Sequence, residues 1–80
     1  MNSLYIYAYP GQMLVFQILT DDDVVLTNEN CEFSEVVRTT AKYLQKEDIK
    51  KIFVVGKTVF ADKVADMINT NLYTPAIERI

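Results

Sequence analysis

Histidine and tryptophan are absent from this chain of 80 residues, and cysteine occurs only once, at Cys31. Without histidine, the chain lacks the most common general base and the most common metal ligand of proteins. A single cysteine cannot form an internal disulfide, so we expect a reducing, cytoplasmic setting. The sequence predicts no metal site and no cofactor.

Long apolar runs and clusters of positive charge are also missing. No apolar stretch approaches the ~18–20 residues of a membrane-spanning helix, and the start, MNSLYIYAYP, lacks the pattern of a signal peptide. The net charge is −3, and Lys50 and Lys51 are too few for a phosphate-binding surface. We therefore expect no membrane insertion, and the charge balance argues against a nucleic-acid partner.

Half of the residues are apolar and 24% are charged, which is typical of one globular domain over residues 1–80. The first thirty residues resemble strands. Residues 4–9 alternate between Leu4, Ile6, Ala8 and three tyrosines, residues 13–20 are apolar on both faces, and residues 24–27 extend a third strand. Pro10-Gly11 and the run Asp21–Asp23 predict the turns between them.

The apolar period changes after residue 32, and two helices are expected. The first carries an apolar stripe with Ser34 as its N-cap, and the second follows Thr58 as its N-cap. The expected stripes are Phe33, Val36, Val37, Thr40, Ala41 and Leu44, then Phe60, Val64, Met67 and Ile68. Between the helices, residues 50–56 predict a buried strand that ends at Gly56, and residues 76–80 predict a short last strand.

The element order β-β-β-α-β-α-β predicts an α/β (α+β) fold with a mixed five-stranded sheet in the order 3-2-1-4-5. Both crossover connections step across the sheet in the same direction, so right-handed crossovers place both helices on one face. Nothing else in the chain is left to cover the opposite face. A sheet with one face in solvent usually has strands that alternate between apolar and polar residues, yet the second and fourth strands are apolar on both sides.

The uncovered face is therefore the predicted interface. If Leu4, Ile6 and Ala8 face the helices, then Tyr5, Tyr7 and Tyr9 line the other side, together with Phe53 and Val55 of the fourth strand. Tyrosine is favoured at interfaces because it combines a large contact area with a polar tip. The alternative is an ordinary half-buried sheet surface, and the residues alone leave both interpretations open.

Two segments resemble a known family. The order of elements is similar to that of the ribonuclease H-like fold. IKKIFVVGKTVFADKVADMINTNLYTPAIERI resembles part of one subdomain of bacterial actin-like ATPases of the cell-division and pilus-assembly type, with Gly56, Leu72 and Pro75 at matching places. The hairpin YPGQMLVFQI resembles the phosphate-binding hairpin of that family, or the Asp-Pro-Gly hairpin of junction-resolving nucleases.

The resemblance implies a nucleotide site at Pro10, Gly11, Gln12, Gly56 and Lys57. The sequence departs from the family there. Tyr9 stands in place of the aspartate, and a phenol with a pKa of ~10 cannot hold Mg²⁺ as a carboxylate does. Lys57 replaces the second glycine of the pair that faces adenosine in the family. We therefore expect that this chain is not an enzyme.

Other candidate sites have simpler interpretations. Asp21–Asp23 could bind a cation, but three consecutive side chains diverge, so a solvated turn is favoured. Cys31 could be a reactive thiol, but it has no basic neighbour in sequence, so an inert small side chain is favoured. A degenerate nuclease that still holds nucleic acid is the weakest alternative, because the chain is acidic.

The sequence thus predicts a non-catalytic protein–protein interaction module that uses the uncovered sheet face, either for self-association as a homodimer or for docking to a larger assembly. The alternative is an incomplete nucleotide-binding half-site of an actin-like ATPase, which a second chain would complete and in which ATP would be the ligand. Whether residues 1–80 are a whole protein or a piece of a longer one stays open.

Overall fold

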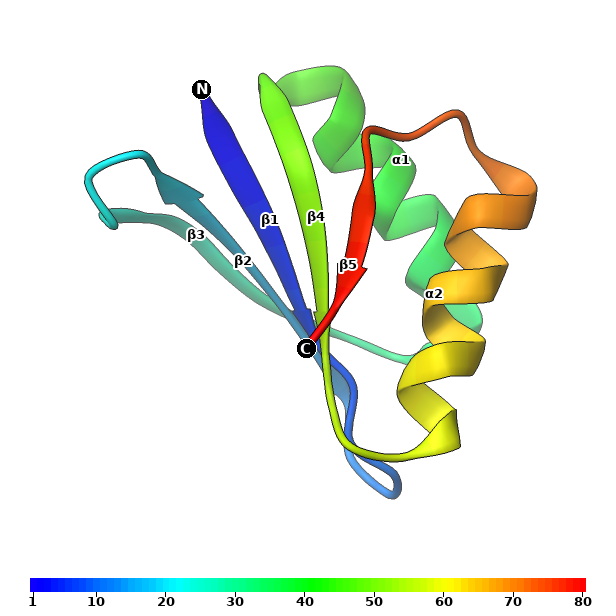
Figure 1. The fold of residues 1–80 in the computed structure, drawn as a ribbon. Coiled ribbons are helices and arrows are strands. Elements are labelled where there is room, and N and C mark those ends of the chain that lie inside the picture. The colour runs from blue at the N-terminus through cyan, green and yellow to red at the C-terminus, as the bar shows by residue number, and fades with distance from the viewer.

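The computed structural model describes all of residues 1–80 as one mixed five-stranded sheet with two α-helices (Figure 1). In chain order the elements are β1 (Asn2–Tyr7), β2 (Leu14–Thr20), β3 (Val25–Cys31), the 3₁₀ helix η1 (Phe33–Glu35), α1 (Val36–Lys46), β4 (Ile49–Val55), α2 (Val59–Asn71) and β5 (Ile77–Arg79). The strand order is β3-β2-β1-β4-β5, which confirms the predicted sheet.

β1 is the central strand of the sheet. It pairs antiparallel with β2 and parallel with β4; β3 is antiparallel to β2, and β5 is parallel to β4. Both helices lie on the same face of the sheet (Figure 1), as right-handed crossovers stepping in one direction require. The opposite face carries no element of this chain.

The hydrophobic core lies between the sheet and the two helices. In β1, β2 and β4, alternate residues face this layer. Leu4 and Ile6 of β1 are fully buried, as is Ala8 just after it, as predicted. The fully buried side chains of β2 and β4 are Leu14, Phe16, Ile18, Ile52 and Val54, and the helices add Val36, Ala61, Val64 and Ile68. The period-two pattern therefore places one side of each of these three strands in the core, whereas the edge strands β3 and β5 contribute no fully buried residue.

The helix starts agree with the sequence in one case of two. Thr58 caps α2, because its hydroxyl oxygen accepts a hydrogen bond of 3.3 Å from the Phe60 N–H. The prediction for Ser34 is wrong. Ser34 lies inside η1, and the N-cap of α1 is Glu35, which makes no capping bond with its side chain. The 3₁₀ turn satisfies backbone groups locally, since the Glu35 N–H bonds to the Glu32 carbonyl.

The buried face of α1 is rotated from the predicted stripe. Val36 and Thr40 are buried as expected, but Thr39 and Tyr43 complete the face in place of Val37 and Leu44. Polar side chains can be buried there because their hydroxyls have partners: the Thr40 hydroxyl donates to the Val36 carbonyl at 2.8 Å. Phe33, Val37 and Leu44 are partly buried at the edge of the core.

Two differences between the predicted and observed strand boundaries exceed one residue and change the interpretation. β3 continues to Cys31, four residues beyond the expected end at Thr27, although its added residues include two asparagines with low strand propensity. Pairing with β2 overrides that propensity. β1 ends at Tyr7, so Tyr9 lies in the β1–β2 turn, not on the strand as predicted.

Gly56 allows the β4–α2 turn to pack directly against the end of β1. A Cβ atom at this position would lie 2.4 Å from the Ala8 carbonyl oxygen and 2.9 Å from the Ala61 Cβ. The Gly56 N–H donates to the Ile80 carbonyl at 3.1 Å. Only glycine leaves room for this approach.

Arg79 ties the last strand to its neighbours. Its guanidinium donates to the Val54 and Gly56 carbonyls, at 2.9 Å each, and to the Asp62 carboxylate on α2 at 2.7 Å. One side chain therefore joins β4, β5 and α2. Because β5 has only three residues and few backbone hydrogen bonds, the hydrogen bonds of Arg79 help to hold it against β4 and α2.

Substitution of Gly56 by alanine tests the close approach. We expect Gly56→Ala to lower the free energy of unfolding by about 3 kcal/mol, because the new methyl group overlaps the Ala8 carbonyl. The matched control is Gly11→Ala, where no atom lies within 4 Å and only the positive φ of 78° is unfavourable; we expect about 1 kcal/mol there. Urea unfolding measures both, and an equal loss for the two variants would contradict the account.

Candidate interaction surface on the open sheet face

The sheet face opposite the helices is apolar at its centre. The residues that alternate with the core positions lie on this face, and they are partly buried although no helix covers them. They are Tyr5 and Tyr7 of β1, Val15, Gln17 and Leu19 of β2, and Phe53 and Val55 of β4. We call these seven residues the open face.

Side-by-side packing within the sheet explains this partial burial. In register, Tyr5 stands between Gln17 and Phe53, while Tyr7 stands between Val15 and Val55. The Tyr5 and Phe53 rings are stacked, with centroids 4.6 Å apart and planes at 17°. Such cross-strand aromatic pairs stabilise a sheet and fix its register.

A polar rim surrounds this apolar centre. On the β5 side, the Lys51 ammonium lies 2.6 Å from the Glu78 carboxylate and 5.2 Å from the Phe53 ring centroid. On the β3 side, Asn28 and Asn30 are exposed in register with β2. An aromatic and aliphatic centre with a polar rim is the usual composition of a protein–protein interface.

Four of the five residues predicted for the interface come together here. Tyr5, Tyr7, Phe53 and Val55 occupy adjacent positions on the two central strands. Tyr9 does not share the strand, because β1 has already ended, and its side chain is 42% exposed in the turn. Val15 and Leu19 also lie on this face but are not among the predicted residues, although apolar residues on both faces of the strand at 13–20 indicated them.

The residues of the alternative nucleotide site share one end of the sheet. Pro10, Gly11 and Gln12 form the β1–β2 turn, and Gly56 and Lys57 begin the β4–α2 turn. Gly56 brings the two turns together through its approach to Ala8. Its own N–H and carbonyl are already bonded, to Ile80 and Arg79 respectively, so they do not point at a ligand.

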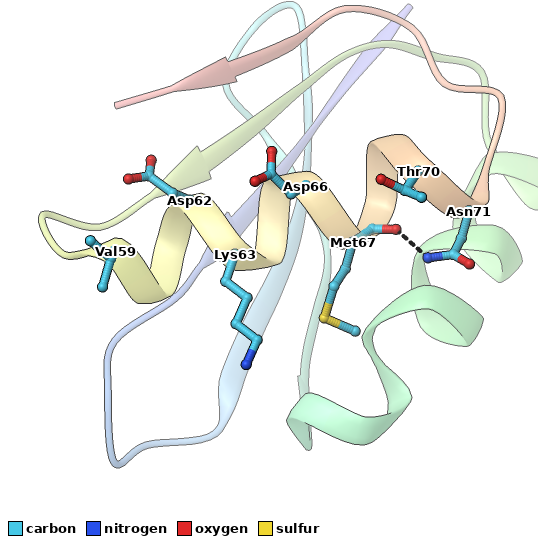
Figure 2. A pocket seen from close by; sticks show the side chains of 7 residues that line it. All are labelled: Val59, Asp62, Lys63, Asp66, Met67, Thr70 and Asn71. Atoms are coloured by element: carbon cyan, nitrogen blue, oxygen red, sulfur yellow. Dashed lines mark hydrogen bonds between the residues drawn. The ribbon is translucent and has the colours of Figure 1, made fainter.

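The hollows of the surface lie elsewhere, and α2 lines all of them. The largest, of about 410 Å³, is shallow and follows the exposed side of α2 (Figure 2). Asp62 and Asp66 point towards β5, whereas Lys63 and Met67 point away from it (Figure 2). Because these side chains diverge, they do not converge on a common ligand. None of the five residues of the predicted nucleotide site lines a hollow.

Asp21–Asp23 form a turn, as predicted. The Asp21 carboxylate accepts a hydrogen bond from the Lys50 ammonium and lies 3.3 Å from the N-terminal amino group. Both contacts lower the pKa of Asp21, and the hydrogen bond from Lys50 is the larger cause. Asp23 has a positive φ of 63°, which aspartate tolerates in turns. The Thr20 hydroxyl oxygen accepts from the Val24 N–H at 3.1 Å and closes the hairpin.

Cys31 is buried at the end of β3, and burial raises the pKa of its thiol. A thiol that holds its proton is a poor nucleophile, which favours the interpretation of Cys31 as a packing residue.

Tyr43 and Glu29 form the main polar contact between α1 and β3. The Tyr43 hydroxyl donates to the Glu29 carboxylate, which also accepts from the Lys42 ammonium at 3.0 Å. The Tyr43 and Lys42 hydrogen bonds lower the pKa of Glu29. Desolvation, with the Glu29 hydrogen bond as a second cause, raises the pKa of Tyr43 far above its usual value.

Comparison with protein-family models and with curated proteins gives no match for this chain. The ribonuclease H-like and actin-like resemblance therefore stays a prediction. Neither of the two helices has the length and apolarity that crossing a membrane requires.

The Tyr43–Glu29 contact predicts a pH-dependent contribution to stability. Because the pKa of Glu29 is lower in the folded state than its ordinary 4.5, the contact stabilises the fold above that value and is lost as the pH falls through the folded-state pKa. Tyr43→Phe should raise the pKa of Glu29 and cost about 1 kcal/mol at pH 7, a figure that allows for partial exposure.

Carboxyl NMR shifts against pH measure the first effect, and urea unfolding at several pH values measures the second. The difference in stability between Tyr43→Phe and the original chain should shrink as the pH is lowered. Tyr73→Phe, at a fully exposed tyrosine, is the control and should leave the pKa of Glu29 unchanged. An unchanged pKa in Tyr43→Phe would contradict the proposed cause.

Proposed function

We propose that this chain is a non-catalytic interaction module that pairs with a second copy of itself through the open face. The observation that supports this proposal is the row of aromatic and aliphatic side chains on a sheet face that no helix covers. A sheet face with this composition gains free energy when a partner removes it from water. The single buried cysteine is compatible with a reducing, cytoplasmic setting.

The size of the face suits a homodimer. The two longest dimensions of the molecule are 30 and 23 Å, so one face can bury at most roughly 700 Å² per copy, close to the ~800 Å² per partner of a standard interface. A second copy of the chain offers a face of the same size, so the available area is compatible with a homodimer.

The charges on the rim are also compatible with a two-fold arrangement. Lys51 and Glu78 lie beside each other on this face. In a symmetric dimer the same patch meets itself, so a patch that carries both signs can pair with its own copy. The apolar centre contains no charged side chain among its seven residues, and no buried charge would have to lose its water.

Association can be tested by light scattering on a sizing column between micromolar and millimolar concentration. We expect a dimer that dissociates on dilution. Tyr7→Ala combined with Phe53→Ala should weaken the dimer by about 10-fold or more, since aromatic residues at the centre of an interface contribute most to affinity. The measurement also requires far-UV circular dichroism, which should show that the double variant stays folded.

The matched control for that experiment is Tyr73→Ala, because Tyr73 is fully exposed outside the open face. It should dimerise as the original chain does. A monomer at millimolar concentration, or a double variant that associates unchanged, would refute self-pairing through this face.

A second proposal concerns the end of the sheet that carries the β1–β2 turn, with Pro10, Gly11 and Gln12, and the β4–α2 turn, with Gly56 and Lys57. The packing of Gly56 against Ala8 supports it, because it joins the two turns that the actin-like resemblance assigns to a nucleotide. The exposed Lys57 ammonium would supply positive charge for phosphates. This half-site would need a second chain to enclose the nucleotide.

Titration with Mg-ATP tests the second proposal. If the half-site binds, amide NMR shifts should move at Gly11, Gln12 and Lys57 at millimolar nucleotide, and Lys57→Met should reduce the effect. Lys63→Met is the control, because Lys63 is not among the five residues of the half-site and its ammonium lies 5.4 Å from the Phe33 ring centroid. An absence of shifts at these three residues would end the proposal without affecting the first one.

A further inference from the structure

β3 forms a long free edge of the sheet. It has seven residues, VLTNENC, whereas the opposite edge strand β5 has three. Figure 1 shows that no other element lies along the outer side of β3. Natural proteins usually protect such edges with lysine, proline, a β-bulge or a covering segment. The one irregularity of the β2–β3 ladder lies at its hairpin end, between Ile18 and Leu19. β3 contains no lysine and no proline, and its one charged residue, Glu29, is held by Tyr43 and Lys42.

The hydrogen-bond pattern shows which backbone groups face outward. The Thr20 N–H donates to the Val24 carbonyl at 3.0 Å, and bonded pairs alternate along an antiparallel ladder. Leu14, Phe16 and Ile18 therefore bond to β3, through their partners Cys31, Glu29 and Thr27. The residues between those partners, Asn28 and Asn30, direct their N–H and carbonyl groups away from the sheet.

An exposed aliphatic run lies at the hairpin end of this edge. Val24, Val25 and Leu26 are 50–55% exposed, and they are three consecutive large apolar side chains. The ladder has an irregularity between Ile18 and Leu19 at this point, which turns the strand locally. When a peptide adds to a sheet edge as a further strand, main-chain hydrogen bonds give affinity and side-chain contacts give selectivity. The unpaired backbone groups of this edge and the apolar side chains beside them could make both kinds of contact.

The charges around the edge indicate the chemistry of its partner. Asp22 and Asp23 precede β3 and Glu32 follows it, all three exposed. A second copy of β3 would bring these acids close to acids of the other copy, whether the two strands ran parallel or antiparallel, and like charges across a strand pair are unfavourable. A segment with lysine or arginine would instead be attracted.

We propose that the free edge of β3 binds an extended segment of another protein, rich in aliphatic and basic residues, which adds as a sixth strand. Asn28 and Asn30 would supply the backbone hydrogen bonds, and Val24–Leu26 would contact its aliphatic side chains. The sixth strand would lie beside β3, so β3 and β2 would separate it from β1 at the centre of the open face. It would use backbone groups in the plane of the sheet, whereas the homodimer would use side chains of the open face, so the two proposals can fail separately.

A synthetic probe tests this edge directly. The probe is a seven-residue peptide of alternating lysine and valine with both ends blocked. On titration to millimolar concentration, we expect the largest amide NMR shifts in β3, together with slower hydrogen exchange at Asn28 and Asn30. The same peptide with glutamate in place of lysine should bind about 10-fold more weakly or worse, because charge attraction is replaced by repulsion.

Two controls separate strand addition from plain charge attraction. A lysine–valine peptide that is N-methylated at alternate residues keeps its charge but cannot donate to the edge, so it should lose the β3 shifts. Asn28→Pro removes an outward N–H, which an edge strand tolerates, and should reduce binding at least about 5-fold.

Either of two results would overturn the proposal: no β3 shifts with the lysine–valine peptide at millimolar concentration, or equal binding of its N-methylated form. If Asn28→Pro does not fold, the N-methylated peptide still decides the question on the original chain. Tyr7→Ala with Phe53→Ala should bind the peptide unchanged. A result in which that double variant loses the dimer but keeps peptide binding would separate the two surfaces.

Discussion

The handedness of the two crossover connections determines the rest of this structure. β3 connects to β4 through α1, and β4 connects to β5 through α2, and both steps go the same way across the sheet. Right-handed connections then require both helices on one face. No element within residues 1–80 lies on the other face, so the core forms one layer on one side, and the second side is stabilised by contacts among the strands themselves.

Because the core lies on only one side of the sheet, the ends of the strands and helices depend on specific contacts to hold them in place. The apolar area between sheet and helices is limited by the length of two short helices, and the last strand has only three residues. Gly56 and Arg79 provide such contacts in different ways. The absence of a side chain at Gly56 lets β4 and β1 finish in contact, and the guanidinium of Arg79 bonds to two backbone carbonyls and to α2. Both contacts hold the same end of the sheet, where its parallel strands finish.

The sequence predicts the topology of this chain better than its details, for physical reasons. Period two and period 3.6 are properties of side-chain direction, so they identify the strands, both helices and the buried side of β1. The false N-cap at Ser34 arises because local propensity cannot show that a 3₁₀ turn precedes α1. The rotated face of α1 depends on Glu29, which lies 14 residues before Tyr43 in the chain, and no local pattern reveals that pairing. The open face itself could be deduced, because it follows from connection order alone.

The open face and the β3 edge represent two different physical means of binding on one small sheet. The face offers apolar area, whose burial is non-directional. The edge offers outward N–H and carbonyl groups in fixed register, which accept only an extended backbone. Since side chains point along the sheet normal and backbone groups point within its plane, occupation of one surface leaves the groups of the other free. The proposed dimer and the proposed sixth strand would therefore use different groups of the same sheet, and the open face follows from the handedness that leaves it uncovered.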